Sequence, residues 1–372
     1  MRLIGLRLTG FRNLADDRLR FPGEGIALVG RNAQGKTNLL EAVHYLETFR
    51  SFRGAPDREL VRFGENVFRI EGKIESDRGG AAEIAAAFQR SPKQKRVTAD
   101  GKVVARLGDA VGSVATVLFT PSDLGLVRGG PSERRRFLDI VLSLNEPGYL
   151  SALQEFGRAL AQRNAVFRSG GGDAAFAWDE ILVRSGARII ISRARWITGH
   201  ADLFRACYDE MAGCGKARIQ YRSSVAGGRE TADPQATADA FRSALRSSRE
   251  RECRQRTTVV GPHRDEMELT LEEETGRRDL RAYGSGGEQR TAALALRLLE
   301  AETAKRVRGR EPILLLDDVF AELDDQRSAR TLALLEKTGP GQVILTAPKE
   351  SEVRFRRESL TRWRIEGGRI EG

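Results

Sequence analysis

Apolar and polar positions alternate in short stretches toward both ends of the chain, and they recur at helical spacing through its middle. Residues 2–9 place Ile4, Leu6 and Leu8 on one face, which predicts a half-buried strand. Further strands are expected at 67–70, 85–88, 114–119, 257–260 and 267–271. An apolar run occurs at 26–29, the fully apolar run 312–316 is typical of a buried strand in a parallel sheet, and 343–346 is expected to be one more buried strand.

The middle of the chain changes character, because from Pro131 to about Cys253 long amphipathic helical patterns replace the short strands. Ser132 is expected to cap the first of these helices. Further stripes predict separate helices around 150–160, 178–189 and 196–208. We therefore predict an α/β domain with a helical insertion, divided into residues 1–124, 125–252 and 253–372.

A glycine-rich loop follows the apolar run 26–29 and reads Gly30-Arg31-Asn32-Ala33-Gln34-Gly35-Lys36-Thr37. A helical pattern follows it, so the context is the strand, loop and helix of a P-loop. The two glycines let backbone N–H groups converge on phosphate oxygens. Lys36 can reach the β- and γ-phosphates of ATP, and the Thr37 hydroxyl can bind Mg²⁺. A chance match is the alternative, which the strand-loop-helix context disfavours.

The apolar run 312–316 ends in two carboxylates, Asp317 and Asp318. A carboxylate at the end of such a strand can hold Mg²⁺ from the side opposite Thr37, and Asp317 fits that role. Asp318 could orient or deprotonate the attacking water. For each carboxylate the alternative is a helix cap or a salt bridge.

A second anion-binding helix start is predicted at Ser285-Gly286-Gly287-Glu288-Gln289, and a helix is expected from Thr291 to Val307. One nucleotide does not need two such sites from one chain. The economical interpretation is that a second copy of the chain presents this segment to the γ-phosphate. We therefore expect an ATP-dependent, two-fold symmetric homodimer.

The net charge of +10 suggests a polyanionic partner, either nucleic acid or an anionic membrane surface, although basic enzymes without such partners also exist. Arg242, Arg246 and Arg249 fall on one helix face, and we hypothesise that they contact DNA; a solvated face is the alternative. The basic and aromatic loop 48–54 could contact phosphate or could be solvated.

The three cysteines, Cys207, Cys214 and Cys253, lack the spacing of a zinc site and are interpreted as reduced thiols. No window approaches 18 uncharged apolar residues, and the N-terminal residues alternate like a strand. We expect a cytoplasmic protein that does not bind membranes.

These motifs together carry a family resemblance. The P-loop, residues 285–289, the pair Asp317-Asp318 and the segment Glu322-Leu323-Asp324 resemble the Walker A, signature, Walker B and D-loop motifs of ABC-type ATPases. The segments that narrow the resemblance to the RecF family are 10–13, 35–42, 129–139 and 261–265. The resemblance covers essentially the whole chain.

The resemblance implies an ABC-type ATPase head similar to those of Rad50 and SMC proteins, with mixed sheets and an inserted α-helical arm at 125–252. It implies an ATP-dependent DNA-binding homodimer that acts at gaps and single-strand/duplex junctions in recombinational repair and replication restart. With RecO and RecR, such a protein helps RecA load onto single-stranded DNA coated by single-strand-binding protein. The expected location is the nucleoid.

The resemblance also implies residue roles. Lys36 and Thr37 would bind phosphate and Mg²⁺, Asp317 would bind Mg²⁺, and Asp318 would position water. Ser285, Gly286, Gly287 and Gln289 would reach the γ-phosphate in trans, and Arg12, Asn13 and Asn38 would lie near the nucleotide.

The glutamine of the ABC pattern is missing, and Asp123 is its best substitute. Two other departures from the wider ABC pattern concern hydrolysis: Asp318 stands where most relatives have Glu, and Ala347 stands where a histidine is usual. We therefore predict slow, DNA-stimulated ATP hydrolysis. The rival functions are the nucleotide-binding subunit of a membrane transporter and a DNA clamp that does not hydrolyse ATP. The position of the signature at residue 285, after a long basic insertion, disfavours the transporter.

Overall fold

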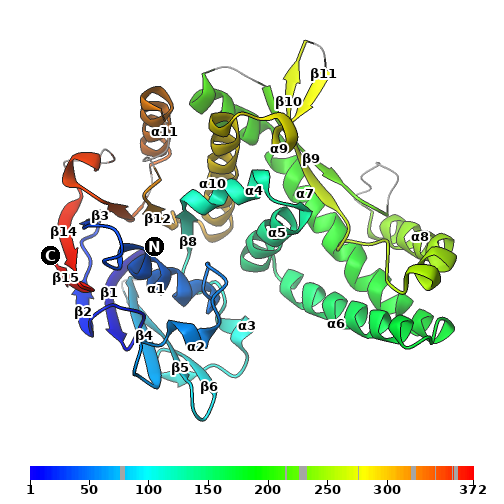
Figure 1. Ribbon diagram of the computed structural model, residues 1–372, viewed down its shortest axis with the longest axis horizontal. Coiled ribbons are helices and arrows are strands. Elements are labelled where there is room, and N and C mark those ends of the chain that lie inside the picture. The colour runs from blue at the N-terminus through cyan, green and yellow to red at the C-terminus, as the bar shows by residue number, and fades with distance from the viewer. Residues whose placement is uncertain are drawn as a thin grey trace. The chain divides into compact units, whose positions relative to one another are not determined.

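The computed structural model describes residues 1–75, 80–213, 216–225, 233–274, 276–319, 324–339, 341–353, 355 and 359–372. The chain forms two compact units, and Figure 1 shows its course through both. The first unit comprises Met1–Asp123 and Glu300–Gly372, and the second comprises Leu124–Leu299. Residues 253–299 thus belong to the same compact unit as the helical segment. The assignment of ATPase head and arm to the segments 1–124, 125–252 and 253–372 stays a prediction.

The first unit contains two six-stranded sheets. The antiparallel sheet has the order β2-β1-β4-β5-β6-β7, and its strands are β1 (Arg2–Thr9), β2 (Asp17–Arg20), β4 (Val67–Glu75), β5 (Ala81–Gln89), β6 (Gln94–Ala99) and β7 (Lys102–Val103). The mixed sheet has the order β15-β14-β3-β13-β12-β8, and its strands are β3 (Gly25–Val29), β8 (Thr116–Phe119), β12 (Ile313–Asp317), β13 (Val343–Ala347), β14 (Thr361–Glu366) and β15 (Arg369–Glu371). All neighbours in the mixed sheet pair in parallel except β14 and β15.

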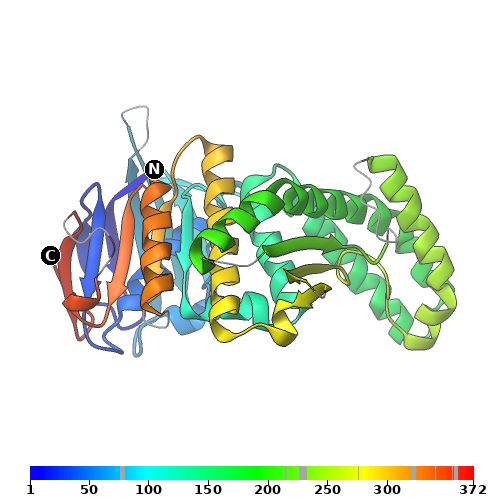
Figure 2. The ribbon, with the colours of Figure 1, turned by 90° about the horizontal axis from the view of Figure 1, so that it is seen from above.

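Helix α1 (Lys36–Thr48) contacts strands of both sheets of the first unit. Figure 1 shows the helix beside these strands, and Figure 2 shows the same ribbon from above. Its apolar residues Leu39, Leu40, Val43 and Leu46 are fully buried, as their helical spacing predicted. The helix lies close to β4 because Gly72 has no side chain: a Cβ there would stand 2.4 Å from Leu46 Cδ1. The remaining helices of this unit are α2 (Asp57–Leu60), α3 (Leu107–Ala110), α11 (Asp325–Lys337) and the 3₁₀ turns η1 (Pro121–Leu124), which ends across the boundary, and η3 (Glu350–Glu352).

The second unit is mainly helical and also holds the three-stranded antiparallel sheet β11-β10-β9. Its strands are β9 (Lys216–Arg222), β10 (Glu266–Glu273) and β11 (Gly276–Asp279). Its helices are α4 (Gly125–Arg128), α5 (Pro131–Asn145), α6 (Tyr149–Arg168), η2 (Asp173–Trp178), α7 (Asp179–Ala212), α8 (Pro234–Gln255), α9 (Leu280–Tyr283) and α10 (Gly286–Arg308), whose last residues belong to the first unit.

The predicted fold class, an ABC-type ATPase head with mixed sheets and a helical arm, is confirmed, but four local predictions were wrong. The stripes at 178–189 and 196–208 form one helix, α7, because no breaking residue separates them. Pro131 is the first residue of α5 and Gly130 its cap, so Ser132 lies in the first turn. Residues 257–260 form no strand, and α10 begins at Gly286 instead of Thr291.

Gln342 ties the two sheets of the first unit together from a fully buried position before β13. Its Oε1 accepts from the N–H of Leu3 at 2.7 Å, and its Nε2 donates to the carbonyls of Leu3 and Pro22, each at 2.9 Å.

Replacing this side chain with one of similar size should therefore leave buried backbone groups without partners. We expect Gln342→Leu to lower the free energy of unfolding by about 3 kcal/mol, since each such group costs about 1–3 kcal/mol. Chemical denaturation measures this, with Gln94→Leu at an exposed position of β6 as the control. Equal stability of the two variants would contradict the bridging role.

Candidate nucleotide site

The predicted P-loop and the predicted carboxylates meet at one edge of the mixed sheet. In this sheet β13 lies between β3 and β12, and all three strands are parallel. Thr346 of β13 is in register with both Leu28 of β3 and Asp317 of β12. The loop that follows β3 and the carboxylate that ends β12 therefore share the carboxyl edge of the sheet, where ligands of such sheets bind.

The P-loop has a backbone that its sequence specifies. Gly35 has φ of 114°, and a Cβ there would stand 2.8 Å from Asn13 Oδ1, so glycine is required on two grounds. Ala33 also has positive φ, at 67°. Lys36 is only 5% exposed, and its Nζ donates to the carbonyl oxygens of Gly30 at 2.7 Å and Arg31 at 3.3 Å. Arg31 and Asn32 form the exposed crest of the loop.

The Thr37 hydroxyl and the Asp317 carboxylate, predicted to bind one Mg²⁺, are in direct contact. Thr37 Oγ1 donates to Asp317 Oδ1 at 3.0 Å, and Thr346 Oγ1 donates to the same oxygen at 2.9 Å. Burial raises the pKa of the Asp317 carboxyl, although hydrogen bonds from Thr346 and Thr37 oppose that shift. Hydroxyl and carboxylate oxygens are the donors that Mg²⁺ prefers, so these two residues fit the ion. When bound there, Mg²⁺ would neutralise phosphate charge.

Asp318 has an unfavourable environment for a carboxylate. Its backbone is left-handed, with φ of 49°, and its N–H donates to Thr346 Oγ1 at 3.2 Å. In the described part of the chain, its Oδ1 is buried and has no hydrogen-bond partner. Burial raises the pKa of Asp318, and the neighbouring charge of Asp317 raises it further, whereas Lys36 opposes the shift. Such a group can accept a proton from water when a cation lowers its pKa again.

The segment from Gly10 to Asn13 supports the P-loop from one side. Asn13 Nδ2 donates to the carbonyl of Gln34 at 3.2 Å, and Asn13 Oδ1 accepts from Asn38 at 2.7 Å. Arg12 turns toward α1, where its Nε and Nη2 donate to the two carboxylate oxygens of buried Glu41 at 2.9 and 3.1 Å. The contacts of Arg12 therefore fix the segment 10–13 to α1, while those of Asn13 reach the P-loop itself.

Two further residues of this site were not assigned by sequence reasoning. Thr346 ends the expected strand 343–346 and was assigned no role there, yet its hydroxyl contacts both Asp317 and the Asp318 backbone. Arg53 belongs to the loop 48–54, whose basic and aromatic pattern left phosphate contact open. Its Nη1 donates to Asn38 Oδ1 at 3.1 Å, and its charge opposes the rise in the pKa of Asp317. Arg53 therefore adds positive charge beside the carboxylates.

The loop that carries Arg53 is fixed through buried Ser51. Ser51 Oγ donates to Glu41 Oε1 at 2.5 Å, and the N–H of Arg53 donates to Ser51 Oγ at 3.1 Å. Glu41 thus holds both Arg12 and this loop against α1.

The predicted signature segment belongs to the second unit, where it begins α10. Ser285 and Glu288 form a reciprocal capping box: the N–H of Ser285 donates to Glu288 Oε2 at 2.7 Å, and the N–H of Glu288 donates to Ser285 Oγ at 3.3 Å. Ser285 is exposed and its hydroxyl proton is still available to donate, while Gly286 and Gly287 form the first turn. Gln289 is buried and donates to the carbonyl of Leu280 at 2.8 Å, which is a structural contact.

The arginines proposed to contact DNA are largely engaged within the second unit. Arg242 binds Glu180 of α7 at 3.0 Å and Asp239 at 2.5 Å. Arg249 lies 3.8 Å from Asp179, and its guanidinium stands over the Phe176 ring. Arg246 is exposed and makes no ion pair with the residues that the structure describes.

The remaining predictions concern single residues. Asp123 is buried, and its Oδ2 accepts from the N–H of Thr120 at 2.8 Å, which closes the turn after β8. Ala347 is buried at the end of β13. Within the described ranges, no cluster of three or more His, Cys, Asp or Glu side chains could hold a metal ion. Cys214 and the D-loop residues Glu322 and Leu323 lie outside the described residues.

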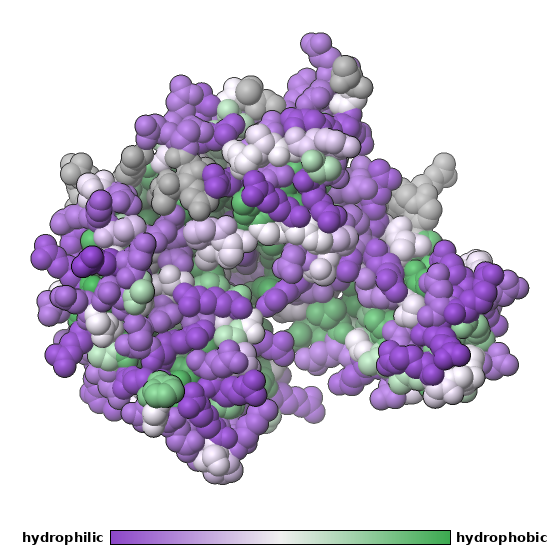
Figure 3. Space-filling view, in the orientation of Figure 1, coloured by the Kyte–Doolittle hydropathy of each residue, from purple (hydrophilic) through white to green (hydrophobic). Residues whose placement is uncertain are grey.

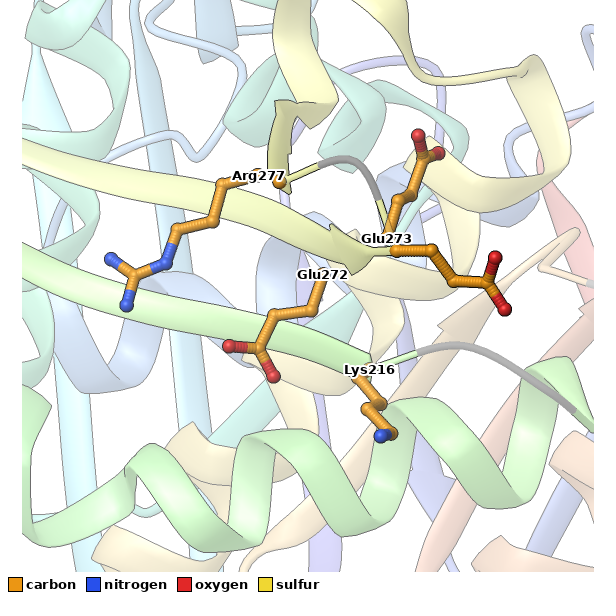
Figure 4. Close-up of a pocket in the computed structure, with 6 residues that line it drawn as sticks. Lys216, Glu272, Glu273 and Arg277 are labelled. Atoms are coloured by element: carbon orange, nitrogen blue, oxygen red, sulfur yellow. The ribbon is translucent and has the colours of Figure 1, made fainter.

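The second unit also has an open groove beside the three-stranded sheet. Figure 4 shows Glu272 and Arg277 extending to the same side of the hairpin while Glu273 extends to the other. Glu272 and Arg277 are cross-strand partners, and Glu272 is also bound by Arg205 at 3.4 Å. Side chains of both charges line this groove, with Lys216 and Arg277 beside three glutamates.

The half-buried Asp318 carboxylate leads to a prediction about stability. Because its pKa is raised, the ionised form destabilises the folded state at neutral pH. This cost disappears as the pH falls below the ordinary value of 3.8, where the carboxyl is protonated in both states. We expect Asp318→Asn to unfold at a higher temperature than the wild type at pH 7 without nucleotide. The difference should shrink toward pH 3.

Thermal unfolding followed by circular dichroism measures both effects. Asp202→Asn at an exposed position of α7 serves as the control. A lower Tm for Asp318→Asn at pH 7 would contradict this account of the carboxylate.

Known proteins resemble this chain along most of its length. Residues 2–366 match the family described as RecF/RecN/SMC N terminal domain. The "DNA replication and repair protein RecF" of Myxococcus xanthus is 38% identical over 379 residues, covering 100% of this chain and 97% of that protein. The protein of the same name from Synechococcus sp. (strain JA-3-3Ab) is 40% identical, covering 89% and 88%.

Solved structures agree with this relation. The structure of the recombination mediator protein RecF-ATP in the RecFOR pathway has a TM-score of 0.89 and 31% identity, covering 99% of this chain and 96% of that chain. The head domain of an Smc protein bound to the C-winged helix domain of ScpA has a TM-score of 0.58 at 15% identity, which shows a shared fold. The family match, the relatives along the whole chain and the structural match agree, and the chain belongs to the RecF family of DNA replication and repair proteins.

Proposed function

We propose that this protein is an ATP-dependent DNA-binding protein of recombinational repair and replication restart, and that ATP hydrolysis acts as a slow switch. The observation that carries this proposal is the contact between Thr37 and Asp317, at 3.0 Å, on the carboxyl edge of the mixed sheet. It joins the residue that follows the P-loop lysine to the carboxylate that ends β12, which is separated from β3 by β13. This arrangement suits a nucleotide triphosphate with its Mg²⁺ ion.

The proposed slowness of hydrolysis rests on the groups around Asp318. Its carboxylate is one methylene shorter than the glutamate usual in ABC-type ATPases, and its backbone is held in the left-handed region. Ala347 gives the end of β13 no side chain that could hold a proton. Proton transfer from water would then depend on Asp318 alone, with its raised pKa.

In the proposed cycle two copies of the chain enclose ATP. Lys36 and Thr37 of one copy bind the phosphates, and Ser285 with Gly286 and Gly287 of the other copy completes the site at the γ-phosphate. The capping box supports this proposal, because it leaves the Ser285 hydroxyl at an exposed helix N-terminus. The closed dimer would hold gapped DNA or a single-strand/duplex junction, and with RecO and RecR would promote RecA loading.

Mixing two inactive variants tests the composite site. Lys36→Met removes the phosphate-binding amine, and Ser285→Asp keeps a good helix cap but repels the γ-phosphate. Each variant alone should lose ATP-dependent dimer formation and turnover. A mixed dimer regains one intact site, built from the P-loop of the Ser285→Asp chain and the signature of the Lys36→Met chain. We therefore expect the mixture to recover a measurable part of the ATPase activity.

The mixture is compared with each variant at the same total concentration, and sizing with ATP and with ADP follows the dimer. Lys102→Met, at an exposed position of β7, is the control for Lys36→Met. Mixtures of each variant with the wild type serve as the check, and both should bind ATP analogues. If they do so but the mixture of the two variants recovers no activity, each site is complete within one chain.

A DNA clamp that does not hydrolyse ATP is the second candidate, because Asp318 Oδ1 is buried with no hydrogen-bond partner among the described residues and the pKa of Asp318 is raised. We expect gapped DNA to stimulate ATP loss by the wild type and Asp318→Asn to lower that rate at least tenfold, in line with the loss of a general base. Phosphate release measures the rate. Equal rates for the two proteins would favour the clamp.

A further inference from the structure

The antiparallel sheet of the first unit has one face that packs inward and one that is exposed. Along β4, the residues Phe68, Ile70 and Ile74 are buried and contribute to the core around α1. The alternate residues of β4, among them Arg69 and Lys73, are exposed. We call the side that carries the alternate residues the outer face.

Four cations gather on the outer face around Gly5 of β1. Strand pairing places Arg18 of β2 directly opposite Arg7, and it places Arg20 and Lys73 on either side of Gly5. All four side chains are exposed. Neighbouring strands lie about 4.8 Å apart, and alternate residues lie about 7 Å apart, so the four cations occupy one compact patch.

Most of this positive charge has no acidic partner. Arg7 lies 3.5 Å from Glu71, but Glu71 also binds Arg69 at 2.8 Å. Arg18, Arg20 and Lys73 make no ion pair with any residue that the structure describes. Glu83 is the cross-strand neighbour of Lys73 but forms no ion pair with it.

The arrangement costs stability, because like charges directly opposite each other on a sheet repel. Arg7 and Arg18 are such a pair. A row of phosphates would remove this cost, and duplex DNA carries one negative charge per about 1.7 Å of helix axis. A broad ligand can approach these charges, since all four side chains are exposed and Gly5, which lies among them, has no side chain.

We propose that the outer face of the antiparallel sheet binds the phosphate backbone of duplex DNA through Arg7, Arg18, Arg20 and Lys73. This proposal deepens the proposed function and rests on it. The face favours a duplex over a single strand, because its described residues include no aromatic side chain on which unpaired bases could stack. It favours phosphates over bases, because a six-stranded sheet is broader than the two-stranded ribbon that the major groove admits.

Two triple variants of the full-length protein with equal charge change test the surface. The sheet variant is Arg18→Gln/Arg20→Gln/Lys73→Gln. The arm variant is Arg246→Gln/Arg251→Gln/Arg254→Gln on α8, where all three side chains are exposed and make no ion pair among the described residues. Fluorescence anisotropy with labelled duplex DNA, in the presence of ATP, gives Kd at several salt concentrations. ATP binding by each variant checks that the nucleotide-binding unit is folded.

We expect the sheet variant to bind duplex DNA at least tenfold more weakly at low salt. The slope of log K against log salt should become shallower by about 2 to 3, as expected for the loss of three phosphate contacts. The arm variant should change Kd less than threefold.

Several outcomes would overturn the proposal. Unchanged binding by the sheet variant, or equal losses in both variants, would exclude a specific role of this face. A loss confined to the arm variant would place DNA on α8 instead. A sheet variant that keeps DNA binding but loses binding to vesicles of anionic phospholipid would assign the face to a membrane. If the wild type itself binds no DNA, the proposed function fails as well.

Discussion

Two adjacent carboxylates held partly out of water at the end of β12 are the constraint on which the nucleotide site depends. Burial raises the pKa of both Asp317 and Asp318, so the folded chain disfavours their charged forms. The hydroxyls of Thr37 and Thr346 compensate Asp317 in part, since both donate to its Oδ1. A divalent cation would compensate the rest, because it favours the ionised carboxylates. Binding of a metal-nucleotide complex and stability of this edge are therefore thermodynamically coupled.

Helix α1 connects the phosphate-binding residues to two other segments. Its first turn carries Lys36 and Thr37, and one turn further Glu41 holds both Arg12 and Ser51. The segment before the P-loop strand and the loop that carries Arg53 are thus fixed to the same rigid element as the phosphate-binding residues.

Local sequence patterns predicted the parts of this fold that depend on local physics. The P-loop, the buried strand that ends in Asp317 and the burial of α1 all follow from apolar periodicity and from the conformational freedom of glycine. Contacts between distant segments could not be predicted in this way. Thr346 became part of the site only because β13 lies between β3 and β12, and strand order is not encoded in the pattern of any one strand. The contact of Arg12 with α1 could not be predicted either, because its partner Glu41 is 29 residues away along the chain.

Contacts between distant segments also decide whether the arginines of α8, which helical spacing indicated as a DNA surface, carry uncompensated charge. Spacing along a helix shows which side chains share a face, but the charge of that face also depends on acids from neighbouring helices. Asp179 and Glu180 of α7 neutralise Arg249 and Arg242. On the antiparallel sheet the opposite occurs: β2, β1 and β4 bring cations from three separate segments together and supply few acids. Uncompensated charge is a property of the tertiary arrangement. For a chain of net charge +10, the location of unpaired cations is therefore a better guide to a polyanion surface than their density in the sequence.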